Sequence, residues 1–129
     1  MTKKIFGKAN MNVVGVTYND RQGKLLHLRN HEENAYLTLR REKNNEYDEN
    51  AIQVIAHIKD DKERKPFCIG YIPREKSIYL AKIIDDNKIV RVSRQKTDGI
   101  KQPFVIGSGN NGYNLGCQIT VVFELKEQN

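Results

Sequence analysis

Residues 39–54 read LRREKNNEYDENAIQV, and this stretch decides how the rest of the chain can fold. It begins as the end of a strand, continues for nine residues without an aliphatic side chain, and becomes a strand again at Ala51. Asn and Asp side chains close turns by hydrogen bonding to nearby backbone groups. Loops that a rigid scaffold holds often carry binding residues. The stretch therefore predicts two strands joined by a polar loop, which is either a solvated hairpin connection or a binding loop.

The length and composition favour a single domain. The chain has 129 residues, of which 38% are hydrophobic, and a chain of this length can bury about two thirds of its unfolded surface in one core. We expect one domain over residues 1–129, with residues 1–10 as a loose segment and residues 11–125 as the fold.

The charge favours a polyanionic partner. There are 22 Lys and Arg residues against 16 Asp and Glu residues, which gives a formal net charge of +6. Nucleic acid is the first choice of polyanion, and an acidic membrane is the second. No long basic amphipathic helix is present, and such a helix is what lies on a bilayer. We therefore expect nucleic acid and no membrane partner.

The cysteines and histidines do not predict a metal site. Cys68 and Cys117 lie far apart in apolar runs, and the three His residues fall in different elements, whereas structural zinc needs about four convergent ligands. We expect both cysteines to be buried in the core and no cofactor or metal to be bound. The N-terminus has no apolar signal-peptide core and no segment is long enough to span a membrane, so we expect the protein in the cytoplasm.

Hydrophobic periodicity predicts a mainly β fold with two helices, in the order β-α-β-β-β-α-β-β. Close spacing of short strands by turns favours a small barrel or sandwich over a parallel sheet. Residues 97–113 are glycine-rich and receive no assignment. The expected strands span residues 11–18, 35–41, 51–58, 67–72, 88–94 and 116–126, and the expected helices follow Asp20 and cover residues 74–85.

The sequence favours a binding domain over an enzyme. It contains neither the spacing of a phosphate-binding loop nor a nucleophile elbow. We therefore expect no catalytic residues and no small-molecule substrate.

At this point the central stretch carries a resemblance. REKNNEYDENAIQV (residues 41–54) resembles the signature of the HIRAN domain, and two further blocks agree with that family in order and spacing. VVGVTY (residues 13–18) resembles its opening strand, and IGYIPR (residues 69–74) resembles the block before its second helix. The resemblance covers roughly residues 11–125.

The resemblance implies a six-stranded, OB-like or SH3-like small β-barrel with two helices. HIRAN domains occur alone in bacteria and phages, and are also fused to SWI2/SNF2-type ATPases that act at stalled replication forks. In a fused member of the family the domain binds the 3′ end of single-stranded DNA. The resemblance therefore implies binding of a free 3′-OH end in DNA repair or replication, with a separate helicase, ATPase or nuclease as a candidate partner.

Several residues match types that line the family's DNA pocket. Tyrosine rings offer faces on which bases stack. The carboxylate of Asp48 repels phosphate, but it can accept a hydrogen bond from a terminal 3′-OH. The matching residues are Tyr18, Asn45, Tyr47, Asp48 and Tyr113.

The chain also departs from the DNA-binding member. Thr17 stands where that member has an Arg, Tyr71 stands where it has a His, and Arg74 replaces a Lys and keeps the charge. Tyr71 can still donate one hydrogen bond and add stacking area. Without a cation at Thr17, we expect either weaker binding or a phosphate held by Arg40, Arg41 or Lys43 at the loop entrance.

Two alternatives remain open. The first is a protein-interaction module that binds a peptide in the barrel groove or on a strand edge, and the second is a metal-dependent nuclease accessory. Each binding residue also has a structural alternative, because Tyr47 and Tyr18 could be packed tyrosines and Asp48 could only close the turn.

Overall fold

The computed structural model describes residues 4–59, 65–94, 98, 102–109 and 114–125. Within these ranges the chain forms seven strands, two α-helices and a short 3-10 helix, η1. In chain order these are β1 (Phe6–Asn12), α1 (Arg21–Asn30), η1 (Glu32–Asn34), β2 (Ala35–Arg41), β3 (Ile52–Ile58), β4 (Phe67–Tyr71), α2 (Arg74–Asp85), β5 (Val90–Val92), β6 (Phe104–Ser108) and β7 (Leu115–Glu124).

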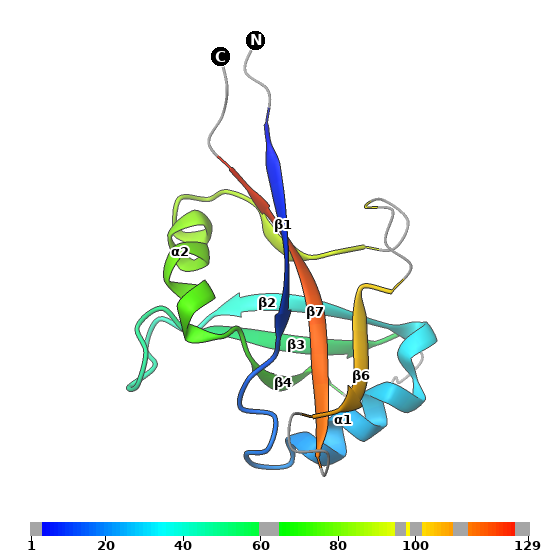
Figure 1. The fold of residues 1–129 in the computed structure, drawn as a ribbon. Coiled ribbons are helices and arrows are strands. Elements are labelled where there is room, and N and C mark those ends of the chain that lie inside the picture. Colours follow the sequence, from blue (N-terminus) through cyan, green and yellow to red (C-terminus); the bar gives the residue numbers. More distant parts are fainter. Residues whose placement is uncertain (1–3, 60–64, 95–97, 99–101, 110–113, 126–129) are drawn as a thin grey trace.

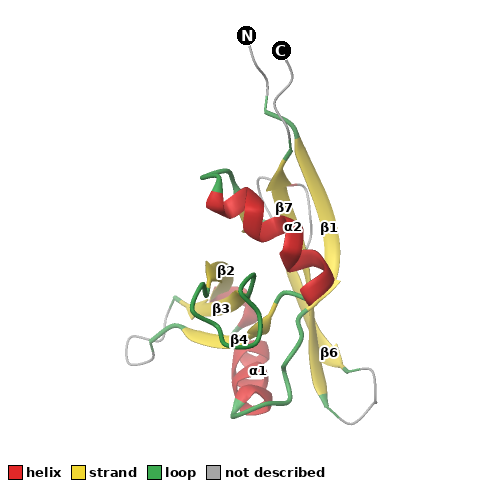
Figure 2. Ribbon diagram, turned by 90° about the vertical axis from the view of Figure 1, so that its left-hand side faces the viewer, coloured by secondary structure: helices red, strands yellow, loops and turns green. Residues whose placement is uncertain are grey.

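The strands form two antiparallel sheets that cross one another (Figure 1). In one sheet β7 is central, with β1 on one side and with β5 and β6 following each other along the other side. The second sheet is the meander β2-β3-β4. β1 and β7 run side by side (Figures 1 and 2), and beyond them the Leu125 amide donates to the Ile5 carbonyl at 2.6 Å.

The predicted closed barrel is not seen in the described part of the chain. No backbone pairing joins β2 to β5 or β6 among the described residues, so the two sheets remain separate on this side. The strand count is also different, because β6 falls within the glycine-rich stretch that periodicity left unassigned. The mainly β class with two helices is confirmed.

The N-terminal segment was predicted wrongly. Residues 6–10 belong to β1, which pairs with β7 from Phe6 opposite Glu124 to Asn12 opposite Gln118. The predicted strand over residues 11–18 ends early, because Gly15 adopts a positive φ of 74° and the chain then turns into α1. Periodicity did not predict a strand at residues 6–10, because only one face of β1 meets the core and its other positions are mostly polar.

The core lies between the two sheets and is covered by both helices (Figure 2). The apolar spacing in α1 and α2 places one face of each helix against it, and alternation in β3 and β7 does the same for the strands. Its fully buried members include Leu25, Leu28, Ile52, Val54, Ile69, Leu80, Ile119 and Val121.

A close crossing joins the chain before α1 to β4. The Val14 amide donates to the Tyr71 carbonyl at 2.8 Å, and the Tyr71 amide donates to the Val14 carbonyl at 2.9 Å. Gly70 makes this crossing possible, because a side chain there would collide with the Val14 carbonyl oxygen and with Val13. The crossing fixes the position of Tyr71 at the end of β4.

Candidate nucleic-acid interface

The loop between β2 and β3 (residues 42–50) is held by its own side chains. The Asn45 oxygen accepts from the amides of Tyr47 at 2.8 Å and Asp48 at 2.9 Å, and its Nδ2 donates to Glu42 at 2.7 Å. One oxygen of Asp48 accepts from the Asn50 amide at 2.9 Å. An amide oxygen has two lone pairs, so the two loop amides occupy both acceptor positions of the Asn45 oxygen. The Asn45 oxygen therefore shapes the loop, and the predicted contact of Asn45 with DNA stays a prediction.

Arg41 also belongs to the framework of this loop. Its guanidinium forms a two-pronged pair with the Asp85 carboxylate at 3.1 Å and donates to the Glu49 and Ala51 carbonyls at 3.1 and 3.0 Å. Four of its donor groups are used in this way, and its side chain is 10% exposed. These hydrogen bonds hold the pKa of Asp85 below its usual value. Arg41 thus anchors the loop, and its predicted contact with phosphate stays a prediction.

Lys43 remains accessible at the loop entrance. Its side chain is 69% exposed, and its ammonium group lies 3.8 Å from Asp85, at the long end of an ion pair. Such a pair holds a lysine only weakly, so Lys43 is free to approach phosphate.

Two tyrosines present their rings to solvent. Tyr47 is 86% exposed at the tip of the loop, and Tyr18 is 68% exposed in the turn before α1. Neither is a packed core tyrosine. Tyr47 has an anchored backbone on both sides, because Asn45 and Arg41 hold the loop around it. The exposed ring on this anchored backbone is available to stack on a base.

The turn at Gly15 brings Tyr18 close to Tyr71. Atoms of Tyr18, Arg21 and Tyr71 all lie within 4.0 Å of the position that a Cβ on Gly15 would occupy. The Arg21 guanidinium donates to the Gly15 carbonyl at 2.8 Å and lies 5.3 Å from the centre of the Tyr71 ring. The sequence analysis missed Arg21, because its contact with Tyr71 depends on the turn at Gly15, and no sequence motif predicts that turn.

The Tyr71 hydroxyl connects this turn to the loop. It donates to the two carboxylate oxygens of Glu42 at 3.1 and 3.2 Å. Burial raises the pKa of Tyr71, and the negative charge of Glu42 raises it further. The one hydrogen bond that Tyr71 was expected to donate is thus already made. Glu42 was also missed, although it lies inside the motif that carries the resemblance.

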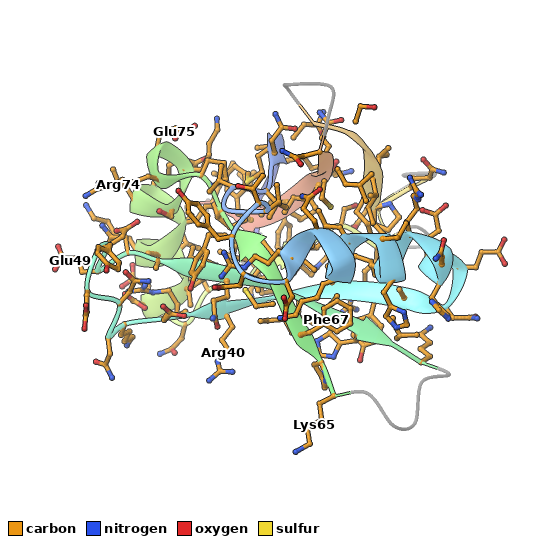
Figure 3. All side chains as sticks on the ribbon, turned by 90° about the horizontal axis from the view of Figure 1, so that it is seen from below. Arg40, Glu49, Lys65, Phe67, Arg74 and Glu75 are labelled. Atoms are coloured by element: carbon orange, nitrogen blue, oxygen red, sulfur yellow. The ribbon has the colours of Figure 1, made fainter. Side chains whose placement is uncertain are left out.

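The remaining predicted residues differ in exposure and in hydrogen bonding. Arg74 is exposed at the first position of α2, on the same side of the molecule as Glu49 of the loop (Figure 3). Asp48 is half-buried and, among the described residues, its second oxygen has no hydrogen-bond partner. Tyr113 lies outside the described residues. Hydrogen bonds through Glu42 and Asn45 therefore connect Tyr71 to the backbone of Tyr47 and Asp48, and Tyr18 lies near Tyr71 at the Gly15 turn.

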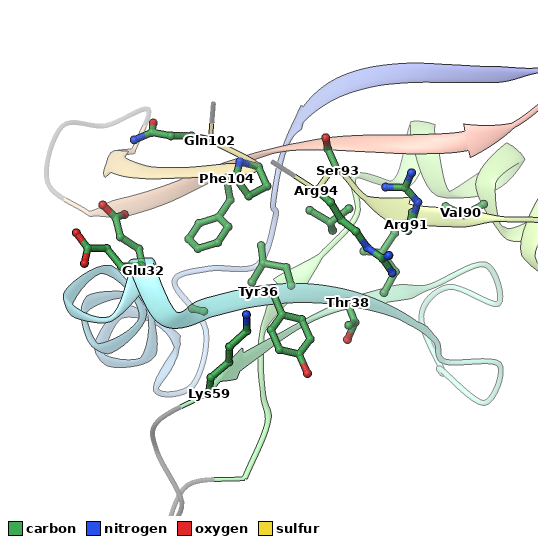
Figure 4. A pocket seen from close by; sticks show the side chains of 16 residues that line it. Glu32, Tyr36, Thr38, Lys59, Val90, Arg91, Ser93, Arg94, Gln102 and Phe104 are labelled. Carbon is green, nitrogen blue, oxygen red and sulfur yellow. The ribbon is translucent and has the colours of Figure 1, made fainter. Parts of the chain in front are cut away.

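A separate groove of about 900 Å³ lies between the sheets, where a barrel would have closed (Figure 4). It runs along β2 and faces residues 90–94 and 102–104. None of the predicted DNA-binding residues lines it. Arg91 on its wall is held by Asp98 through two bonds of 2.7 and 2.9 Å, which also keep the pKa of Asp98 far below its usual value.

The described residues offer neither a cluster of metal ligands nor a long apolar helix. They contain no group of three or more His, Cys, Asp or Glu side chains placed to hold a metal ion. None of the helices in the same ranges is long and apolar enough to cross a membrane. Cys117 is buried, which raises its thiol pKa to about 12, and Cys68 is partly buried, so neither is an exposed reactive thiol.

Comparison with known proteins adds two matches. The sequence profile of the HIRAN domain matches residues 6–126. The fold is similar to that of the crystal structure of a protein from Lactobacillus plantarum, with a TM-score of 0.56 and 20% sequence identity over 96% of this chain and 100% of that chain. No curated protein sequence is significantly similar to the chain.

Proposed function

This chain belongs to the HIRAN domain family, and on that premise we propose that it binds single-stranded DNA at a free 3′-OH end. Membership of the family indicates nucleic-acid binding in general, and the end preference is our proposal. The exposed Tyr47 ring beside Asp48, on a loop anchored from within, is the observation that supports it most strongly. We propose no catalytic step, so a helicase or nuclease acting at the same end would be a separate protein in DNA repair or replication.

Each residue has a role in this proposal. Tyr47 and Tyr18 stack on the terminal bases, and Tyr71 lies between the Gly15 turn and the loop. The free oxygen of Asp48 accepts the hydrogen bond of the 3′-OH, while Arg74 and Lys43 contact the phosphates behind it. A terminal phosphate would meet the negative charges of Asp48 and Glu42, and this repulsion is the source of the proposed end preference.

The test exchanges the Asp48 charge while keeping the turn. In Asp48→Asn the remaining oxygen can still accept from the Asn50 amide, but the charged acceptor for the 3′-OH is lost. We expect affinity for a DNA strand ending in 3′-OH to fall about tenfold or more, and affinity for the same strand ending in 3′-phosphate to be unchanged or higher. Fluorescence anisotropy measures both.

The matched control is Glu49→Gln, which removes the same charge from an exposed neighbour in the same loop. We expect it to leave the preference for 3′-OH intact. If Asp48→Asn bound the 3′-OH strand as tightly as the unchanged protein, the proposed role of Asp48 would be wrong.

One observation favours a second candidate function, a protein-interaction module. The Glu42 amide donates to the Ala51 carbonyl and the Lys59 amide donates to the Asn34 carbonyl, just beyond the ends of the β2-β3 ladder. Backbone groups along a strand point alternately to its two sides, so those of Leu37 and Leu39 point away from β3 and towards the groove of Figure 4. An extended peptide could add to this edge as a further strand. Binding of a largely apolar peptide there would depend little on salt, whereas DNA binding weakens steeply with added salt.

A further inference from the structure

The outer face of the β2-β3-β4 sheet continues from the residues of the proposed end-binding site. Gln53 of β3 pairs directly with Tyr71 on one side and with Arg40 on the other. Directly paired residues point to the same face of a sheet. The outward positions of β3 therefore lead away from Tyr71, first to Ile55 and then to His57.

At the far end of this face two aromatic rings form a stack. The Tyr36 and His57 rings lie 4.6 Å apart between centroids with an interplanar angle of 3°. The Thr38 hydroxyl is 2.8 Å from the His57 Nε2 atom and fixes the orientation of that ring. Tyr36 is 45% exposed, so part of its ring is accessible to a ligand. Partial burial lowers the pKa of His57, which favours the neutral ring.

The same face is positively charged. The Lys59 ammonium lies 5.9 Å from the centre of the Tyr36 ring. Arg40 and Lys65 are exposed and point away from the ribbon on the same side of the molecule (Figure 3). Arg40 has no ion-pair partner within the ranges that the structure describes. The outward positions of β2 and β3 hold no acidic residue to oppose these charges.

We infer that this face is a second contact site for the same DNA strand, on the 5′ side of the end-binding pocket. The inference rests on the proposed function and names the path of the strand beyond its terminal nucleotides. Bases stack on the Tyr36–His57 pair, while Arg40 and Lys59 contact phosphates. This combination of stacking rings and unpaired cations on a sheet face is how many single-strand-binding domains hold DNA without sequence preference.

The geometry sets a length requirement. From Gln53 to His57 the strand advances by roughly 13 Å at the usual rise per residue. A DNA strand that only fills the end-binding pocket cannot reach the stack, whereas a longer one can. The unchanged protein should thus bind an oligonucleotide of about twelve nucleotides more tightly than one of about three, when both end in 3′-OH.

The test compares Tyr36→Ala and Tyr36→Phe with both oligonucleotides. We expect Tyr36→Ala to weaken binding of the longer strand about tenfold and to change binding of the shorter strand less than about twofold. Tyr36→Phe keeps the stacking face and should restore most of the affinity. Tyr79→Ala, which removes a partly exposed tyrosine from α2, is the matched control and should change neither.

The outcomes separate this inference from the proposed function. Equal affinity for long and short strands, or no effect of Tyr36→Ala on the longer strand, would overturn the second site and leave the end-binding pocket standing. Equal weakening of both strands would assign Tyr36 to the fold and also overturn the inference. If neither the long nor the short strand bound the unchanged protein, the proposed function and the second site would both be wrong.

Discussion

At the scale of single residues, the motif in the loop serves two purposes at once. Asn45 and Arg41 direct their polar groups into the loop, and Tyr47 and Asp48 are presented outward as a result. Glu42 joins the two groups, because it accepts from both Asn45 and Tyr71. The residues that hold the loop therefore lie beside those that we propose to bind DNA, and changing either kind should impair binding for different reasons.

Arg41→Lys tests the framework role. A lysine keeps the charge but cannot reproduce the forked pair with Asp85 or reach both carbonyls. The lost hydrogen bonds to the Glu49 and Ala51 carbonyls should lower the free energy of unfolding by about 1–2 kcal/mol. Chemical denaturation measures this change. Lys43→Gln removes a nearby exposed cation and should leave stability within about 0.5 kcal/mol. If both variants were equally stable, Arg41 would not anchor the loop.

Residue roles were predictable from sequence only in part. The family resemblance selected the segment that contains Tyr47 and Asp48, and residue type suggested what each could do. Residue type alone could not show that the Arg41 guanidinium is hydrogen-bonded within the fold, because its partner Asp85 lies 44 positions away in the sequence. It likewise missed Arg21, whose contact with Tyr71 arises from the left-handed turn at Gly15.

At the scale of elements, glycines decide where the two sheets can approach. Gly70 lets β4 pass against the chain at Val14, and that crossing places Tyr71 beside the loop. The opposite case is Gly23 in α1, where an added Cβ would meet nothing within 4 Å. One glycine is required by packing, and the other only weakens a helix.

Gly70→Ala and Gly23→Ala should therefore have opposite effects. Gly70→Ala forces the crossing strands apart and should lower the free energy of unfolding by about 2–4 kcal/mol. Gly23→Ala should raise it by about 0.5–1 kcal/mol, because alanine is the better helix former. Thermal and denaturant unfolding of the two variants measure both effects. A stable Gly70→Ala protein would show that the crossing is not needed for the fold.

Sequence periodicity predicted the bounds of an element correctly where one face of that element is clearly apolar. The predicted bounds of β2 and α2 agree with the structure, because both have regular apolar stripes and well-marked ends. β6 was missed because glycine and proline surround a short apolar run, and its pairing with β7 is set by long-range contacts. The first strand was placed too late because the polar side of β1 carries no apolar signal.

At the scale of the whole molecule, the two sheets present different surfaces. Among the described residues, the outer face of β2-β3-β4 carries the Tyr36–His57 stack and the cations Arg40 and Lys59, whereas the groove between the sheets exposes the edge of β2, with Tyr36 and Lys59 also on its rim. The net charge of +6 draws a polyanion to the molecule without selecting a site. The local arrangement of Tyr47, Asp48 and Tyr71 is what would select a strand end.

The most direct measurement is fluorescence anisotropy with three single-stranded DNAs of one sequence, ending in 3′-OH, in 3′-phosphate or in a 3′ hairpin, at low and at moderate salt. The account predicts tightest binding to the free 3′-OH, with affinity falling steeply as salt is added. Equal binding to all three would reduce the pocket to a general basic surface and contradict the role of Asp48. Binding to none at low salt would contradict DNA as the partner and favour the peptide groove.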